Sequence, residues 1–522
     1  MGKDAGAARA GNRWSWPVLA ALPVAIAAVW LRIAHFSPFE IMHADELMQY
    51  LEQGNRLATG RGLVPWEAHY GLRGALIEQF VALFLWMGHL LSDEQLFAVR
   101  LARAAFGALT LLTLPAAWRL GALSSRRHAL VALFVASVWW EAVLFSDLLL
   151  SESLASALIL LAAAPLLTDD DRSATARASD MYLLTSGFLL GLGVLARLQY
   201  APFVAVLAIA ALRLDWRRWR PVVLGGLAAA LLGAASDLAM GRVPFAWIMV
   251  NVAMNIGHGI ASRFGVSGPF AYLIGLYTHL APIMVPLLVA ALLAGRRYWP
   301  LMAAATVNVL IHSMIAHKEY RFIWLSTLTV LILAAIATVR LADRLAERRG
   351  GIAGPAGIAI VCLAWLGASF ASEYKSGGYP AFRGGGAVPR LALRALDDPR
   401  TCAIALDFEI KAHLVPALLP RPVPILLVPT GGRPLSGTRA PGLAPGLAPG
   451  LAQGANALIL ATPDTALPGW HREACEAMGD QQACLFRREG TCAPAPQWSY
   501  QKMIDIDAGL DAGLDAGLAG RP

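Results

Sequence analysis

The sequence predicts a polytopic α-helical membrane protein that ends in a small soluble α/β domain. Of its 522 residues, 57% are hydrophobic and only 15% are charged, and the mean hydropathy is +0.55. Soluble domains carry about 25% charged residues, so this composition excludes an ordinary globular protein. Apolar segments of about 20 residues, the length that crosses a bilayer as a helix, recur up to residue 371 and then stop.

The apolar segments predict about eleven transmembrane helices within residues 17–371. They cover 17–36, 97–118, 128–146, 149–167, 181–196, 199–212, 221–240, 270–294, 299–316, 322–339 and 352–371. The first has the length of a span and lacks a small-residue cleavage site, so we expect no cleaved signal peptide. A further apolar run, Ala75–Leu91, is expected to lie along the membrane surface, with a twelfth crossing as the alternative.

The distribution of basic residues orients the chain. If 75–91 does not cross, fifteen arginines fall in loops on the side of the N-terminus, and seven arginines and lysines fall on the other side before the last span. The positive-inside rule then places residues 1–16 in the cytoplasm and the loop 37–96 outside. These cytoplasmic arginines also explain most of the net charge of +8, which therefore implies no nucleic-acid partner.

The first outside loop, 37–96, carries the acidic pair Asp45 and Glu46 in the segment His43-Ala44-Asp45-Glu46. A carboxylate just beyond a span can act as a general base, because its neighbours tune its pKa. The alternative is structural, with both acids in the first turn of a helix and stabilised by the helix dipole. The pair is therefore a candidate catalytic site with a structural alternative.

Aromatic and charged side chains follow in the same loop, namely Trp66, Glu67 and Arg73. This mixture is typical of a sugar-binding platform, although Trp and Tyr also form interface belts in membrane proteins. Two residues farther along are further candidates for substrate contact: Arg197, where two apolar runs meet, and Tyr272, just after the second long outside loop. The alternative for Arg197 is snorkelling to lipid headgroups.

The segment His317-Lys318-Glu319-Tyr320-Arg321-Phe322 places three charged side chains and a histidine between two apolar runs. Charges are costly inside a bilayer, so the cluster belongs at the membrane edge or faces a polar cavity. Lys318 and Arg321 are natural partners of phosphate, which predicts a phosphate site with His317 and Glu319 beside it. The alternative is a basic patch that holds anionic lipid, against which Glu319 and the outside location argue.

From residue 372 to 504 the composition is that of a soluble domain, which we expect outside the membrane. The expected elements are strands at Thr401–Phe408, Val423–Val428 and Ala457–Ala461 and a short helix at Glu409–Leu418. The Pro/Gly-rich insert at 440–454 predicts a flexible linker, and residues 505–522 predict a disordered low-complexity tail.

Four of the five cysteines lie in this C-terminal domain, and the fifth lies in the last span. The four are Cys402, Cys475, Cys484 and Cys492. In an oxidising compartment they can form two disulfides, for which three connectivities are possible. The alternative is four free thiols. The histidines of the outside loops lack the i, i+4 spacing of metal ligands, so no zinc site is predicted.

His317-Lys318-Glu319-Tyr320-Arg321-Phe322 resembles the signature His-Lys-Glu-x-Arg-Phe of glycosyltransferase family 22, the mannosyltransferases of GPI-anchor and N-glycan assembly. His43-Ala44-Asp45-Glu46 is similar to the family's His-Pro-Asp-Glu. The family's order continues with Gly60, Gly62, Trp66-Glu67 and Arg73, and Ser151-Glu152-Ser153 weakly resembles its third segment. The resemblance covers residues 17–345.

The sequence departs from the family pattern at two places. Ala44 replaces the usual proline, and residues 268–272 are a partial version of an aromatic-rich segment. The C-terminal domain has no counterpart that we can name. These departures affect the expected acceptor and sugar more than the expected chemistry.

The resemblance implies an inverting glycosyltransferase of the GT-C fold, which moves a hexose from a polyprenyl- or dolichyl-phosphate donor to a glycolipid or glycan acceptor on the outside face. Mannose is the expected sugar. Asp45 is the expected general base with Glu46 in support, and His317, Lys318 and Arg321 are expected to stabilise the leaving phosphate. The lipid-phosphate sugar is a co-substrate, and no obligatory cofactor or metal is expected.

The Ala-, Arg- and Leu-rich composition favours a bacterial plasma membrane, with the endoplasmic reticulum as the eukaryotic equivalent. Two alternatives to a mannosyltransferase stay open. One keeps the GT-C fold but transfers arabinose, glucose or an aminosugar. The other is a non-enzymatic transporter of lipid-linked sugars, although such proteins often contain internal repeats, which we do not find in this sequence.

Overall fold

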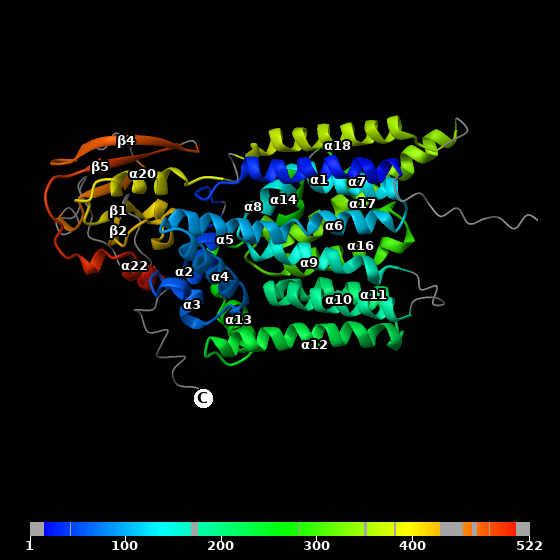
Figure 1. The fold of residues 1–522 in the computed structure, drawn as a ribbon, viewed down its shortest axis with the longest axis horizontal. Coiled ribbons are helices and arrows are strands. Elements are labelled where there is room, and N and C mark those ends of the chain that lie inside the picture. The colour runs from blue at the N-terminus through cyan, green and yellow to red at the C-terminus, as the bar shows by residue number, and fades with distance from the viewer. Residues whose placement is uncertain are drawn as a thin grey trace, which may run out of the picture.

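The computed structural model describes residues 15–41, 43–168, 176–280, 282–348, 352–379, 383–428, 453–461, 467–479 and 481–507. Nearly all of the predicted cytoplasmic N-terminus, the Pro/Gly-rich insert and the low-complexity tail lies outside these residues. The described part is a bundle of long, roughly parallel helices with a small mixed sheet at one end (Figure 1).

The helical part runs through eighteen α-helices with short 3-10 and π segments between some of them. The α-helices are α1 (Trp16–His35), α2 (Glu52–Thr59), α3 (Trp66–Tyr70), α4 (Leu76–Leu91), α5 (Gln95–Thr110), α6 (Thr113–Ala122), α7 (Arg126–Val138), α8 (Trp140–Asp147), α9 (Ser151–Leu166), α10 (Ala176–Ala196), α11 (Ala201–Leu212), α12 (Trp216–Ala239), α13 (Ala246–Val252), α14 (Ala271–Leu280), α15 (Met284–Leu292), α16 (Trp299–Met314), α17 (Trp324–Glu347) and α18 (Pro355–Ser376). The short segments are η1 (Glu46–Leu51), η2 (Leu198–Tyr200), η3 (Ala253–Gly257), η4 (Ile260–Phe264), η5 (Arg296–Tyr298) and η6 (Tyr320–Ile323).

By length and composition, 6 helical stretches among the described residues can cross a membrane, or 7 if the bent pair α7–α8 is one span. They are Trp16–His35, Gln95–Ala122, Ser179–Ala196, Trp216–Ala239, Tyr320–Glu347 and Pro355–Ser376. The predicted class, a multi-pass helical membrane protein, is confirmed. The count of eleven spans stays a prediction, and so does the surface location of α4, which is one of the shorter apolar helices.

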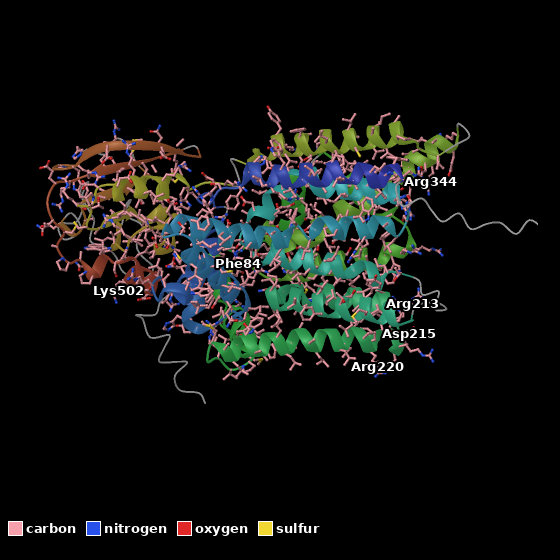
Figure 2. All side chains as sticks on the ribbon, viewed as in Figure 1. Phe84, Arg213, Asp215, Arg220, Arg344 and Lys502 are labelled. Atoms are coloured by element: carbon pink, nitrogen blue, oxygen red, sulfur yellow. A yellow bond between two sulfur atoms is a disulfide. The ribbon has the colours of Figure 1, made fainter. Side chains whose placement is uncertain are left out.

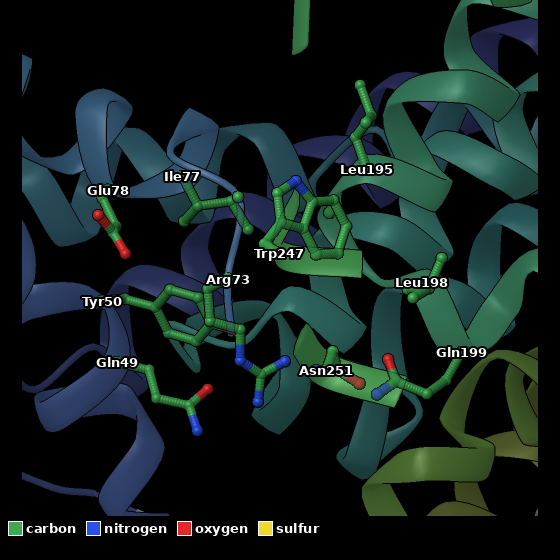
Figure 3. A pocket seen from close by; sticks show the side chains of 12 residues that line it. Gln49, Tyr50, Arg73, Ile77, Glu78, Leu195, Leu198, Gln199, Trp247 and Asn251 are labelled. Atoms are coloured by element: carbon green, nitrogen blue, oxygen red, sulfur yellow. The ribbon is translucent and has the colours of Figure 1, made fainter. Parts of the chain in front are cut away.

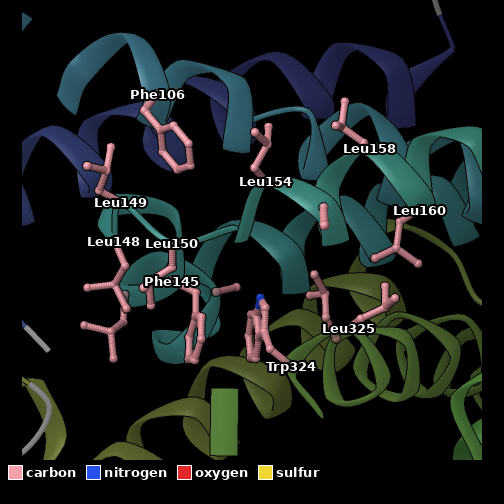
Figure 4. Close-up of a cluster of buried hydrophobic side chains, with 14 of the residues drawn as sticks. Phe106, Phe145, Leu148, Leu149, Leu150, Leu154, Leu158, Leu160, Trp324 and Leu325 are labelled. Carbon is pink, nitrogen blue, oxygen red and sulfur yellow. The ribbon is translucent and has the colours of Figure 1, made fainter. Parts of the chain in front are cut away.

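Helix α17 lies at the centre of the bundle, since it packs against α7, α9, α15 and α16 and most of its length is buried. Its first residue, Trp324, stacks on Phe145 with ring centroids 4.1 Å apart. Figure 4 shows this pair beside the leucines that link α8 to α9. This packing places the start of α17 against α8 and α9. It also positions the His317–Phe322 segment, which directly precedes α17.

Close helix contacts in this bundle depend on small residues. A Cβ added to Gly187 of α10 would lie 1.9 Å from the Val222 carbonyl oxygen of α12, and one added to Gly225 would lie 2.0 Å from that of Leu184. Small residues let helices approach in lipid, where no hydrophobic force drives them together. The pair α10–α12 therefore could not pack this way with larger side chains at these positions.

The helix break between α7 and α8 bends the chain by 62°. A break inside a membrane leaves carbonyl groups without helical donors. The Arg32 guanidinium of α1 donates to two of them, the carbonyl oxygens of Ala136 and Ser137 at 3.0 and 3.1 Å, and also to that of Ala142 in α8 at 3.3 Å. The buried arginine thus stabilises the bend, which directs the chain toward the start of α9.

The C-terminal unit contains a five-stranded sheet in the order β2-β1-β3-β5-β4. The elements are α20 (Ala387–Leu396), β1 (Ile404–Asp407), β2 (Ile425–Val428), β3 (Ala457–Leu460), β4 (His471–Met478), β5 (Gln481–Arg487) and α22 (Tyr500–Asp507). Strands β1, β2 and β3 are parallel, and β5 joins β3 and β4 in antiparallel pairing. The helix predicted at Glu409–Leu418 is wrong: this stretch forms two 3-10 turns, Phe408–His413 and Pro416–Leu418, and Pro416 cannot donate a helical backbone hydrogen bond.

Both predicted disulfides are present in the C-terminal unit. Cys402 is bonded to Cys492, and Cys475 is bonded to Cys484 directly across the β4–β5 hairpin. Cys362 in α18 is a free thiol. This selects one of the three possible connectivities.

The C-terminal unit docks on the first loop, residues 37–96. Gln501 of α22 pairs with the backbone of Val64 through two hydrogen bonds of 2.8 and 3.0 Å. The buried Glu52 of α2 accepts from the backbone N–H groups of Leu63 and Ala417 at 2.8 and 3.1 Å, which joins the loop to the C-terminal unit. Ile41 forms an isolated antiparallel bridge with Gly384.

One end of the bundle carries arginines of the predicted cytoplasmic loops. Arg213, Arg220 and Arg344, which the count of basic residues assigns to the cytoplasm, lie at the end remote from the sheet (Figure 2). The first loop and the C-terminal unit share the opposite end (Figure 1). The predicted sidedness is therefore compatible with the arrangement of the helices.

Candidate active site

Four segments far apart in the sequence meet at the end of the bundle that carries the C-terminal unit. They are the turn before η1 with His43 and Asp45, the first turn of α9 with Glu152, the end of α10 with Arg197, and the His317–Arg321 segment between α16 and α17. Asp45 and Arg321 are in contact although 276 positions separate them. The fold thus joins the two motifs that the sequence singles out.

Arg321 is the centre of this ionic cluster. Its guanidinium contacts Asp45 Oδ2 at 2.6 Å, Glu319 Oε2 at 2.7 Å and Glu152 Oε1 at 3.1 Å. A guanidinium has five N–H donors in a rigid fork, which suits three carboxylates at once. An incoming phosphate would have to compete with all three, so Arg321 acts first as an internal counter-ion.

Glu152 links Arg321 to a second cation, Arg197. Its Oε1 lies 3.1 Å from the Arg321 guanidinium and 3.3 Å from that of Arg197, and the Glu152 side chain is fully buried. The Arg197 guanidinium also lies over the Phe322 ring, 4.8 Å from its centroid. Arg197 is therefore an interior residue of the cluster, and the alternative of snorkelling to headgroups does not describe its position.

Glu319 lies between two histidines. Its carboxylate accepts from His317 Nε2 at 2.7 Å and contacts His43 Nε2 at 2.6 Å. Burial lowers the pKa of His43, but its interactions with Asp45 and Glu319 outweigh burial and raise the pKa to about 9. Burial raises the pKa of Glu319, but His43 and Arg321 outweigh it and hold the pKa well below its ordinary value. His43 is thus a cation and Glu319 an anion at neutral pH.

Asp45 is an anion at the open edge of the cluster. Burial opposes its ionisation, but the charges of Arg321 and His43 outweigh burial and hold the pKa of Asp45 well below its ordinary value. The side chains of Asp45, Glu319 and His43 are 18, 21 and 30% exposed, whereas that of Arg321 is only 5% exposed. A substrate can therefore reach Asp45 but not the inner part of the cluster.

Glu46 points away from this cluster. Its carboxylate accepts from the backbone N–H groups of His43 and Leu149, both at 3.2 Å, and lies 3.6 Å from the Arg103 guanidinium. These contacts anchor η1 to α5 and to the α8–α9 connection. The structure thus separates the two acids of the predicted catalytic pair and gives Glu46 the contacts of a positioning residue.

Lys318 also turns away from Asp45. Its ammonium group donates to the carbonyl oxygen of Ser267 at 3.0 Å, and the Ser267 N–H donates to the Ala316 carbonyl oxygen at 3.0 Å. Trp66 of α3 stacks on Phe264 of η4 with centroids 5.9 Å apart, and Phe264 contacts the His317 ring. The loop after η4 therefore lies across the His317–Lys318 backbone and meets α3 of the first loop.

Arg73 lines a pocket beside the cluster (Figure 3). The polar lining is Gln49, Tyr50, Arg73, Glu78, Gln199 and Asn251, and the apolar lining includes Ile77, Leu195, Leu198 and Trp247. Among the described residues, the Arg73 guanidinium has no hydrogen-bond or ion-pair partner, and its Nε is buried. Asp45 and Glu67 lie near enough to attract it electrostatically. Arg73 is thus a cation that is available to a ligand.

Of the remaining predicted residues, Glu67 accepts from Gln49 Nε2 at 2.9 Å, and Tyr272 of α14 is buried near Glu319 and Arg197. No group of three or more metal-ligating side chains in the described parts of the chain is arranged to hold a metal ion.

Two residues of the site were not predicted as site residues from the sequence, Gln49 and Glu152. A carboxylate inside the apolar segment 149–167 was the available signal for Glu152, because such a charge is costly without a partner.

Comparisons with known proteins agree on one class. The profile of the Alg9-like mannosyltransferase family matches residues 24–376. The structure of ArnT from Cupriavidus metallidurans in the apo state is similar with a TM-score of 0.56 at 15% identity, and ArnT bound to undecaprenyl phosphate is similar with a TM-score of 0.56 at 14% identity. Both similarities cover 92% of this chain and 100% of the ArnT chain. A search of curated proteins found no match. The fold is that of GT-C glycosyltransferases.

Proposed function

The chain belongs to the Alg9-like mannosyltransferase family, and from this membership we propose that it transfers mannose from a polyprenyl-phosphate donor to a hydroxyl group of a glycolipid or glycan acceptor, with inversion at the anomeric carbon. The observation that carries the proposal is the ionised Asp45 at the open edge of the cluster, beside the unpaired cation Arg73. A base and a phosphate-binding cation are the two groups that the reaction requires.

Asp45 would act as the general base. The acceptor oxygen attacks the anomeric carbon, its proton passes to the Asp45 carboxylate, and the bond from the anomeric carbon to the phosphate oxygen breaks with its electron pair on the phosphate. Negative charge grows on the phosphate as the bond breaks, so a fixed cation lowers the barrier. Arg321 and His43 hold Asp45 in place, and Glu46 supports it by anchoring η1.

Arg73 is the best-placed partner for the donor phosphate. Lys318 and Arg321 already have partners in the structure, whereas Arg73 has none among the described residues and lines a small pocket. Ile77, Leu195 and Leu198 add apolar groups to the wall of the same pocket. The similarity to ArnT, which was solved with undecaprenyl phosphate, supports a polyprenyl-phosphate donor.

The reaction would take place on the non-cytoplasmic face of a bacterial plasma membrane. The two disulfides of the C-terminal unit support an oxidising compartment for that end of the bundle. The arginine-rich loops at the other end support a cytoplasmic location there.

A donor panel tests the function. Membranes that contain the protein are incubated with radiolabelled polyprenyl-phosphate mannose, glucose or arabinose, with and without excess chelator. We expect transfer of label to a lipid or glycan fraction from the mannose donor, and unchanged transfer with chelator, because no obligatory metal is expected. Transfer from the glucose or arabinose donor alone would reject mannose but keep the enzyme class. Binding of donor without transfer to any fraction would favour a transporter.

Replacing Arg73 by glutamine should weaken the handling of the donor. Loss of a charged hydrogen bond to phosphate corresponds to about 1.5–3 kcal/mol, or roughly a 10- to 100-fold fall in kcat/KM for the donor. The matched control is Arg61→Gln, an exposed arginine of the same loop, for which we expect wild-type kinetics. A donor kcat/KM that is the same in Arg73→Gln and in wild type would contradict the phosphate role.

A further inference from the structure

Gln49 of η1 is a buried polar residue with one satisfied and one unsatisfied end. Only 4% of Gln49 is exposed. Its Nε2 donates to Glu67 Oε1 at 2.9 Å, whereas its Oε1 is buried and has no hydrogen-bond partner among the described residues. Because a carboxylate accepts and an amide nitrogen donates, Glu67 fixes which end of the amide is left over. That end is a hydrogen-bond acceptor without a donor.

Gln49 is a neighbour of both Asp45 and Arg73. Asp45 and Gln49 are four positions apart on one helical segment, about one turn, so their side chains lie on the same face. Gln49 and Arg73 line the same pocket, and Figure 3 shows the Gln49 amide oxygen turned toward the Arg73 guanidinium. The unsatisfied acceptor is therefore beside the base and the phosphate-binding cation of the proposed function.

The cavity that Gln49 and Arg73 line is small, about 20 Å³. That volume holds one water molecule or one hydroxyl group, but not a sugar ring. A buried acceptor at the wall of such a cavity needs an O–H or N–H donor, because leaving it unpaired costs free energy. Phosphate oxygens only accept in a phosphodiester, so a sugar hydroxyl is the part of the donor substrate that can pair with Gln49 Oε1.

The position of Arg73 indicates which hydroxyl this is. In a polyprenyl-phosphate sugar the phosphate is bonded to the anomeric carbon, and the one carbon next to the anomeric carbon is C2. When Arg73 holds the phosphate, the C2 hydroxyl is the sugar hydroxyl nearest to Arg73 and to Gln49 beside it. Mannose and glucose differ only in the direction of this hydroxyl, so a contact at C2 can distinguish the two sugars.

We propose that Gln49 is a specificity-determining residue, whose Oε1 accepts a hydrogen bond from the C2 hydroxyl of the donor sugar. This inference rests on the proposed function. The hydroxyl fills the small cavity, while the sugar ring and the phosphate lie outside it, where the partly exposed Arg73 can meet the phosphate. Glu67 is a positioning residue, since it acts through Gln49 by holding the amide in the required orientation.

A cycle that changes both the enzyme and the donor tests this role. The kcat/KM for transfer is measured with polyprenyl-phosphate mannose and with its 2-deoxy analogue, in wild type and in Gln49→Met. The ratio of the two kcat/KM values should be about 10- to 100-fold larger in wild type, because only there does the missing hydroxyl leave a buried acceptor unpaired. The 2-deoxy donor also has a different intrinsic reactivity, but this difference is the same for both enzymes and cancels in the comparison.

The controls separate recognition of the C2 hydroxyl from a structural role. The 6-deoxy analogue lacks a hydroxyl remote from the anomeric carbon, so its ratio to mannose should be the same in wild type and in Gln49→Met. Gln482→Met, a change at an exposed glutamine of β5, should keep both ratios of the wild type. Glu67→Ala frees the Gln49 amide to rotate and should lower the 2-deoxy ratio while Gln49 is still present, which also tests the inference if Gln49→Met does not fold.

The failures of the two proposals can be told apart. If the wild type transfers no sugar from any donor of the panel, the proposed function is wrong. If the wild type transfers mannose and Gln49→Met lowers kcat/KM for both donors alike, the 2-deoxy ratio stays the same and only the role of Gln49 in recognition is wrong. A change in the 6-deoxy ratio in place of the 2-deoxy ratio would overturn the assignment to C2.

Discussion

Replacing Asp45 by asparagine is expected to lower kcat about 1,000-fold, which corresponds to about 4 kcal/mol of activation free energy. Asparagine keeps the size of the side chain and removes the base. The ionic cluster should survive, because Arg321 retains Glu152 and Glu319 as partners. The measurement is single-turnover transfer from the radiolabelled donor, with thermal unfolding in detergent as the check of the fold.

Asp93→Asn is the matched control for this change. Asp93 is an exposed acid of the same loop, and we expect it to be dispensable. Near-normal turnover in Asp45→Asn would reject Asp45 as the base. A loss of activity that is accompanied by a large fall in the unfolding midpoint would instead assign Asp45 a structural role.

Removing the Glu152 carboxylate is expected to have the largest effect on stability. Glu152→Ala leaves Arg197 without an ion-pair partner among the described residues and takes one of three carboxylates from Arg321. Breaking a buried ion pair by removing one partner costs about 3–5 kcal/mol of unfolding free energy. We expect a lower thermal unfolding midpoint and a loss of turnover. Glu152→Gln should show a smaller loss of stability, because the amide oxygen still accepts a hydrogen bond.

A double variant distinguishes the ion pair from simple packing. Arg197→Met in the background of Glu152→Ala removes the unpaired guanidinium, so part of the lost stability should return. Glu347→Ala, an exposed acid at the end of α17, is the control and should keep the wild-type midpoint. If the two single changes add without any recovery, Glu152 and Arg197 do not stabilise the protein as a pair.

The helical class could be predicted well, because repeated apolar runs of span length are stable mainly as helices that cross a bilayer. The bend between α7 and α8 could not be predicted, since the run 128–146 contains no proline or glycine, and carbonyl groups at the break are satisfied by Arg32 from another helix. The hairpin β4–β5 was missed as well. Strand β4 is a half-exposed edge strand, so it lacks the apolar run by which the buried strands were found.

The candidate site was predicted in part. Asp45 and the His317–Arg321 segment do meet, and the prediction that they share one end of the molecule agrees with the structure. The expected roles are distributed differently: Arg321 is paired with carboxylates, Lys318 with backbone carbonyls, and Arg73 is left for an anion. Residue type indicates that an arginine can bind phosphate, but only its neighbours determine whether it is free to do so.

The sequence by itself determined the class of the protein, its family and the motifs that carry the chemistry, because hydropathy and short signatures are local properties of the chain. Only the tertiary structure decided which charges neutralise one another. The His317–Phe322 segment could have been a lipid-binding patch by charge alone, yet Glu152 and Asp45 reach it from distant segments and enclose Arg321. Electrostatic interaction depends on distance and burial, and both are set by how the helices pack.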